Sequence, residues 1–216
     1  MLNNELNLFI KEEVIEKIEN IREQQMSNAL RMHCFIVEKR DGKIKEWAVA
    51  DGMTQTQYFE EEAFSPTVRL ESIMLSSLVD ACEKSYVKTI NIKGAFLKAK
   101  VLEDLELIVK LEGYLAEMMH ELCPDFVIHE DCFVYLKCVK ALYGHIKAAR
   151  LFCNDLNSSS THKMGFVRNQ CDPCIYNKNT EEGQVTIRTH VDDLKVSSVL
   201  MKQLDIVIES LRTIKR

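Results

Sequence analysis

Segments with helical and with strand periodicity alternate along this chain of 216 residues, without the regular strand–helix–strand repeat of a parallel α/β sheet. Apolar residues three or four positions apart predict helices over 5–31 and 110–122, one that opens at Ser65-Pro66, one from about 146 and one from Met201. Alternating apolar and polar residues predict strands at 33–39, 44–50, 87–93, 133–139, 184–191 and 194–198. This mixture favours an α+β fold in which helices pack on one face of an antiparallel sheet.

Composition limits the classes of protein that remain. Apolar residues make up 46% and charged residues 28% of the chain, which excludes wholesale disorder. The net charge of −5 means that binding to nucleic acid requires a local basic surface. Neither a signal peptide nor an apolar run long enough to span a membrane is visible. We therefore expect an intracellular protein, cytoplasmic or nuclear, without a membrane partner.

The eight cysteines are better interpreted as reduced thiols than as a disulfide framework. One pair, Cys171-Asp-Pro-Cys174, has the tight spacing of a zinc ligand pair. A zinc site requires a second pair, and the nearest candidates, Cys153 and His162, fit no finger or ribbon pattern. A cysteine-based metal module stays open as a minor alternative.

Two neighbouring acidic residues, Asp192 and Asp193, lie between two extended runs. The pattern predicts a two-residue turn at these positions, although such turns normally contain Gly or Asn. A solvated turn is one explanation, and capture of a divalent cation by paired carboxylates is the other. Strand alternation in 87–93 turns Asn91 away from the apolar face of Ile90 and Ile92, toward a cleft or water.

Several short motifs in a fixed order distinguish these explanations. They are Asn91-Ile-Lys-Gly-Ala-Phe-Leu97, Lys140-Ala-Leu-Tyr-Gly144, Gly165-Phe166, Asp172-Pro-Cys-Ile-Tyr176 and His190-Val-Asp-Asp-Leu194. The set resembles the reverse transcriptase of copia-type LTR retrotransposons, over about residues 33–200. The resemblance implies the fingers and palm of a right-hand polymerase, with the thumb missing. The regions that it implies are a leader helix at 1–31, a fingers-like region at 32–86 and, at 87–216, a palm-like region with part of the fingers, truncated before the thumb.

The resemblance also implies a two-metal Mg²⁺ site on three acidic positions. Asp192 and Asp193 match two of these catalytic, metal-binding positions, and Asn91 stands where the family has Asp. A neutral amide lowers the formal charge of the ligand set from −3 to −2. Each missing charge–ion pairing is worth about 4 kcal/mol per unit of metal charge at an effective dielectric near 20, before solvent compensates. We therefore expect the Mg²⁺ site to be weakened and catalysis to be impaired or absent.

The family's nucleotide-binding positions correspond to Phe96, Tyr143, Gly144 and Lys45. Phe96 would act as a gate against the ribose 2′-hydroxyl, and Lys45 is a candidate phosphate contact. A second departure is Trp47, where the family has an Arg that reaches the triphosphate, because an indole cannot replace a charged, forked donor.

The function that the resemblance implies is RNA-directed DNA polymerisation in an impaired copy. Its partners would be an RNA or DNA template–primer, a deoxynucleoside triphosphate and the other parts of a retrotransposon polyprotein. The alternative is a relic without catalysis that binds nucleic acid or protein.

Overall fold

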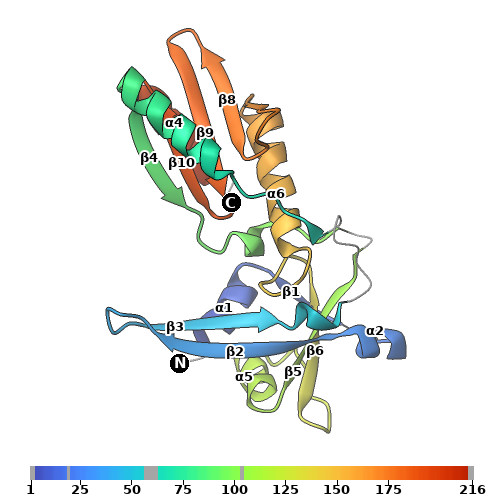
Figure 1. The fold of residues 1–216 in the computed structure, drawn as a ribbon. Helices are drawn as coiled ribbons and strands as arrows, with labels where there is room; N and C mark the ends of the chain where they lie inside the picture. Colours follow the sequence, from blue (N-terminus) through green and yellow to red (C-terminus); the bar gives the residue numbers. More distant parts are fainter. Residues whose placement is uncertain (1–2, 19, 56–62, 103–104, 214–216) are drawn as a thin grey trace. The chain divides into compact units, whose positions relative to one another are not determined.

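The computed structural model describes residues 3–18, 20–55, 63–102 and 105–213, and it divides into two compact units (Figure 1). The first unit contains the described residues of Met1–Ala63 and Phe96–Leu151, and the second contains those of Phe64–Ala95 and Phe152–Arg216. Each unit is thus built from two separate stretches of chain. The polymerase regions expected at 1–31, 32–86 and 87–216 stay a prediction.

A five-stranded sheet in the order β1-β6-β5-β2-β3 organises the first unit. Its strands are β1 (Ile15–Lys17), β2 (Leu30–Glu38), β3 (Ile44–Ala50), β5 (Leu107–Glu112) and β6 (Phe133–Cys138). The predicted β2–β3 hairpin is confirmed, with its turn at Asp41-Gly42. Helices α1 (Asn3–Lys11) and α5 (Tyr114–Leu122) contact this sheet and each other, and α2 (Glu23–Asn28) lies against β5. Fully buried side chains from α1 and the sheet, including Phe9 and Leu136, form the core.

The second unit contains another five-stranded sheet, in the order β4-β10-β9-β8-β7. Its strands are β4 (Tyr86–Asn91), β7 (Val167–Arg168), β8 (Ile175–Thr180), β9 (Gly183–His190) and β10 (Asp193–Ser198). Every pairing in this sheet is antiparallel. The other helices are α4 (Leu70–Glu83), α7 (Met201–Thr213) and α6 (Ala148–Ser158), which runs on into a π-helical turn at Ser159–Lys163.

Helices lie on both faces of the second sheet, so the expectation of helices on one face is wrong. Strand alternation puts Lys88 on one face, where its Nζ binds Asp205 of α7 at 2.6 Å. Lys195 points to the other face and pairs with Asp80 of α4. The expectation of one antiparallel sheet is also wrong, because the chain forms two sheets and β2 pairs with β5 in parallel.

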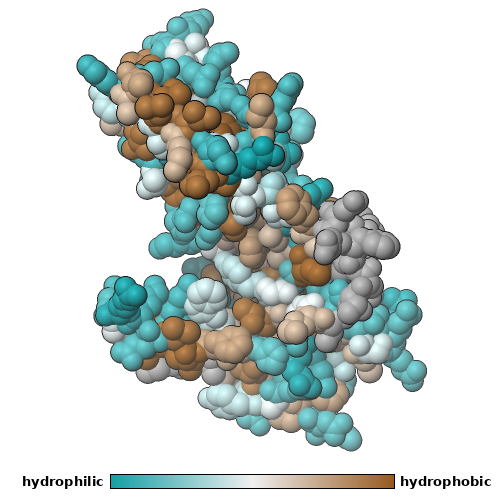
Figure 2. Space-filling model, viewed as in Figure 1, coloured by the Kyte–Doolittle hydropathy of each residue, from teal (hydrophilic) through white to brown (hydrophobic). Residues whose placement is uncertain are grey.

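Helix α4 presents its polar side to the sheet and its apolar side outward. Lys195 and Arg188 reach it from the sheet, and Arg188 donates to the Ile73 carbonyl at 3.2 Å and to Ser76 at 3.1 Å. The outward apolar side chains, each about half or more exposed, are Leu70, Met74, Leu75, Leu78 and Val79. Figure 2 shows apolar residues gathered over this helix. Charged groups of the sheet therefore contact the polar side of α4.

Three predicted helices have different bounds in the structure. The segment expected as one helix over 5–31 forms α1, β1, α2 and the first two residues of β2. Helix α1 is followed by Glu13 in the left-handed region at φ +50°. Residue 19 of that segment lies outside the described residues. The segment 110–122 is a helix only from Tyr114, because the apolar run before it is strand β5. The helix expected at Ser65-Pro66 begins at Leu70 instead, after extended backbone at Arg69.

None of the described helices combines the length and apolar character needed to cross a lipid bilayer.

Candidate functional site

The β9–β10 hairpin carries the two acidic residues at its turn. The turn residues are Val191 and Asp192, so the predicted turn at Asp192-Asp193 is displaced by one residue and Asp193 begins β10. Val191 has a φ of +56°, a conformation that β-branched residues rarely adopt. The N–H of Ile92 donates to the Asp192 carbonyl at 2.8 Å and ties the turn to the end of β4. A strained turn therefore holds the two carboxylates in place.

Asn91 is the last residue of β4 and lies directly opposite Asp193 in the β4–β10 register. Its Nδ2 donates to Oδ1 of Asp193 at 2.8 Å and to Oδ2 of Asp192 at 3.4 Å. Asn91 thus meets two adjacent residues that lie 101 and 102 positions later in the sequence, within the second unit. The amide acts as a hydrogen-bond donor to both carboxylates.

The site is open to solvent. Asn91 and Asp193 are exposed, and Asp192 is half-buried. Within the described residues, no three His, Cys, Asp or Glu side chains gather into a group that would hold a metal. The two carboxylates fit one divalent cation that keeps water or phosphate as its remaining ligands. Asn91 directs N–H groups at the carboxylates and adds no charge to the pair.

The first unit holds a separate row of side chains that includes three of the predicted nucleotide-binding residues. The Phe96 and Tyr143 ring centroids lie 5.0 Å apart, and those of Tyr143 and Trp47 lie 6.5 Å apart. Nζ of Lys45 lies over the Trp47 ring, 3.9 Å from its centroid. The row is an aromatic surface that ends in a cation.

Gly144, the fourth predicted nucleotide-binding residue, allows two backbone segments to approach closely. Its φ is +86°, and a Cβ here would overlap the carbonyl oxygen of Ala50 at the end of β3. The N–H of Ala50 donates to the Tyr143 carbonyl at 2.8 Å. A glycine is required at this point of the turn that presents Tyr143.

Asp172 has a role that the sequence did not reveal. It is 2% exposed, and its carboxylate accepts from the N–H groups of Cys174 at 2.9 Å and of Arg69 at 3.0 Å. Burial alone would raise its pKa, but hydrogen bonds from Ser72 and these two N–H groups outweigh burial and lower the pKa. Asp172 therefore joins the start of α4 to β8. The signal in the sequence was the Asp-Pro pair, because an Asp side chain commonly accepts from the backbone two residues later.

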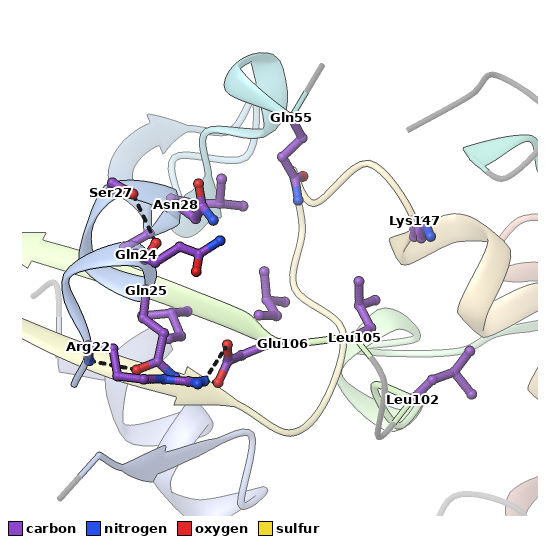
Figure 3. A pocket seen from close by; sticks show the side chains of 14 residues that line it. Arg22, Gln24, Gln25, Ser27, Asn28, Gln55, Leu102, Leu105, Glu106 and Lys147 are labelled. Carbon is purple, nitrogen blue, oxygen red and sulfur yellow. Dashed lines mark hydrogen bonds and ion pairs between the residues drawn. The ribbon is translucent and has the colours of Figure 1, made fainter. Parts of the chain in front are cut away.

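The first unit also contains a cavity of about 530 Å³ beside α2. Figure 3 shows Arg22 and Gln25 pointing toward Glu106, with Gln55 and Lys147 on the opposite side. Glu106 binds both neighbours, with 3.7 Å to the Arg22 guanidinium. None of the predicted site residues is among the residues that line this cavity.

The predicted site residues therefore form two groups in different units. Asn91, Asp192 and Asp193 belong to the second, and Lys45, Phe96, Tyr143 and Gly144 to the first. A family model described as "Reverse transcriptase (RNA-dependent DNA polymerase)" matches residues 22–214. A search of curated proteins finds no match.

Proposed function

Because the chain belongs to the reverse transcriptase (RNA-dependent DNA polymerase) family, we propose that it is a copia-type domain whose polymerase activity is impaired at Asn91. The order of its motifs supports the copia-type assignment. The observation that carries the impairment is the 2.8 Å hydrogen bond from the Asn91 amide to Asp193. The corresponding polymerase regions would be a fingers-like region at 32–86 and a palm-like region with part of the fingers at 87–216.

The reaction is transfer of a nucleotide to a primer. The primer 3′-hydroxyl gives up its proton to water and its oxygen bonds to the α-phosphorus of a deoxynucleoside triphosphate. The bond from that phosphorus to the bridging oxygen breaks, and pyrophosphate leaves. Mg²⁺ held by Asp192 and Asp193 would neutralise charge on the phosphates. Asn91 lowers the affinity for that ion in two ways, since it brings no charge and its N–H groups occupy lone pairs of the carboxylates.

The first unit supplies the nucleotide-binding residues of this proposal. Phe96 and Tyr143 would pack against the sugar of the incoming nucleotide, on the turn that Gly144 allows. Lys45 would contact a phosphate, but its ammonium lies over the Trp47 ring. Moving the Lys45 ammonium off the Trp47 ring to reach a phosphate would cost part of the free energy of nucleotide binding. The substrates are a template–primer and a deoxynucleoside triphosphate, and the partners are other parts of a retrotransposon polyprotein.

Primer extension on an RNA template, with Mg²⁺ or Mn²⁺, tests the proposal. We expect little extension by the natural chain and at least about 100-fold faster extension by Asn91→Asp, because the variant restores the missing carboxylate. Each tenfold in rate corresponds to about 1.4 kcal/mol of activation free energy. Asn179→Asp, at an exposed position of β8 in the same sheet, is the matched control and should leave the rate unchanged. Equal rates for the natural chain and Asn91→Asp would contradict the impairment.

A second candidate function is binding of nucleic acid without catalysis. The hydrogen bonds from the Asn91 amide to both carboxylates favour it. If the natural chain and Asn91→Asp both bound template–primer and neither extended the primer, this second function would be the correct one.

A further inference from the structure

A cavity of about 370 Å³ lies within the second unit. It is formed by the end of the π-helical turn Ser159–Lys163 and the residues after it, by strand β8 and by helix α7. None of the predicted site residues lines it. Its volume falls in the range of about 300–1,000 Å³ that is typical of small-molecule sites. The cavity therefore has the size to bind a small molecule, apart from the Asn91 site.

The floor of this cavity is formed by the apolar side chains of Met164, Phe166 and Val207. Phe166 and Val207 are buried, and Ile206 adds an exposed apolar side chain at the rim. Because Phe166 is only 3% exposed, its ring has no open face on which a planar aromatic ligand could stack. A flexible aliphatic chain fits such a floor, and each methylene group buried there would strengthen binding by about fourfold.

Two lysines bring positive charge to the same cavity. Nζ of Lys178 donates to the Met164 carbonyl at 2.7 Å and lies 5.9 Å from the centroid of the Phe166 ring. This contact holds the ammonium beside the floor and uses one of its three N–H donors. Lys163 is the last residue of the π-helical turn, a rare structure that occurs frequently at functional sites. Donors for an anionic group are thus placed next to an apolar floor.

Among the residues that the structure describes, no acidic side chain lines this cavity. The two acidic residues of α7 are paired elsewhere, Asp205 with Lys88 at 2.6 Å and Glu209 with Arg212 at 3.3 Å. Within the described part of the cavity, the two lysines therefore have no carboxylate to neutralise them. A ligand with an anionic head group would supply the complementary charge.

We propose that this cavity binds a small amphipathic anion, with an aliphatic chain on the apolar floor and a carboxylate or phosphate head group against Lys163 and Lys178. Ammonium groups form strong, charge-assisted hydrogen bonds with either head group. The chain gains free energy because it removes apolar surface from water. The site does not depend on the proposed polymerase function, and it requires neither a metal nor a nucleic acid.

Ligand-observed NMR titration of the whole chain with octanoate and with octyl phosphate tests the proposal and distinguishes the two head groups. At least one of these anions should occupy a single saturable site with a dissociation constant of about 1 mM or below. Octanol has the chain without the charge, and acetate has the charge without the chain. Each should bind at least about 10-fold more weakly than octanoate or octyl phosphate. Equal binding of octanol and both anions would overturn the proposal, as would no binding by either anion.

Substitution of the lysines gives the second test. Lys178→Gln keeps a donor for the Met164 carbonyl but loses the charge, so it should weaken anion binding by about 10-fold and leave octanol binding unchanged. Lys163→Gln, at an exposed position, should weaken it by about threefold. Lys202→Gln, an exposed lysine of α7 that does not line the cavity, is the matched control and should change nothing. If all three folded variants bound the anion equally, the proposal would be wrong.

The exposed apolar side of α4 is a competing place for an aliphatic chain to adsorb. Leu78→Gln makes that side more polar and should leave anion binding unchanged. If Leu78→Gln weakened binding as much as Lys178→Gln, the anion would be adsorbing to α4 and the proposal would be overturned.

A competition experiment separates this cavity from the proposed nucleotide-binding residues. A deoxynucleoside triphosphate such as dTTP should not displace the bound anion, because the cavity shares no residue with the proposed nucleotide-binding set. Displacement by dTTP, lost again in Lys178→Gln, would assign the cavity to nucleotide binding and would also overturn the proposal.

Discussion

Asn91 and Asp193 face each other across strands β4 and β10, and the amide of one donates to the carboxylate of the other at 2.8 Å. An acidic residue at position 91 would meet the same carboxylate with like charge. The hydrogen bond therefore stabilises the site without a metal, where a third carboxylate would require one.

Asn91→Asp should make the thermal stability of the chain dependent on divalent cations. Without metal we expect a loss of about 1 kcal/mol, because three carboxylates then converge at an exposed site of effective dielectric well above that of the interior. With Mg²⁺ the variant should gain more in melting temperature than the natural chain, since ligands that bind only the folded state stabilise it. Differential scanning fluorimetry with and without Mg²⁺ measures both effects. An equal Mg²⁺ response in the natural chain, the variant and Asn179→Asp would contradict this account.

Val191→Gly should stabilise the protein. Glycine adopts a φ of +56° without the steric cost that valine carries, which is about 1–3 kcal/mol, and part of the gain is offset by the greater freedom of glycine in the unfolded chain. A net gain of about 1 kcal/mol is expected in urea unfolding. Glu181→Gly, in the β8–β9 turn at the other end of β9, should destabilise instead, because Glu181 does not have a positive φ. A loss of stability in both variants would show that the Val191 turn is not strained.

Gly144→Ala should destabilise the first unit by about 2–4 kcal/mol, because its Cβ would overlap backbone that cannot move aside easily. Gly42→Ala is the control for conformation alone, since Gly42 also has a positive φ, +77°, but has open space around it. It should cost about 1 kcal/mol. Similar losses in both variants, measured by chemical unfolding, would mean that the close approach to Ala50 is not a constraint.

Asp172→Ala should cost about 2–3 kcal/mol, the usual result of leaving buried N–H groups without an acceptor. The stability of Asp172→Asn should lie between that of the natural chain and that of Asp172→Ala, since one acceptor oxygen is retained. Asp125→Ala, at an exposed position, should have no measurable effect. Proteolysis at the start of α4 offers a separate check, since this segment should open more readily in the Ala variant.

Stability should also fall in mild acid because of His145. Burial, with a smaller contribution from Lys147, lowers the pKa of this histidine to about 4 from 6.5. The unfolded chain therefore binds a proton between these values that the folded chain does not, and folding weakens as pH falls from about 6.5 toward 4. At pH 5 the loss is about 2 kcal/mol, at 1.4 kcal/mol per pH unit. His145→Gln should flatten the pH dependence of unfolding, and His162→Gln, on the surface, should not.

The sequence predicted strands well where one face is buried. Alternation located β2, β3, β4, β9 and β10 to within a few residues, and the motifs indicated that Asn91 and the acidic pair belong together. Leu107–Glu112 escaped prediction because a short apolar run has neither the period of a strand nor that of a helix. The direction of the Asn91 hydrogen bond and the positive φ of Val191 could be seen only in the three-dimensional structure.

The orientation of helix α4 could not be predicted from the sequence. Arg188 and Lys195 of the sheet contact the polar side of the helix through Ser76, Asp80 and a backbone carbonyl. Periodicity identifies an apolar stripe but not the element that the stripe contacts. The deciding residues lie more than a hundred positions away in the chain.

The outward leucines of α4 have a practical consequence for anyone who purifies this protein. An exposed apolar surface binds dyes such as ANS even when the chain is fully folded. Dye fluorescence is therefore a poor measure of unfolding for this protein. The same apolar surface favours adsorption to chromatography resins and aggregation when the protein is concentrated. Mild detergent should prevent this aggregation without unfolding the protein.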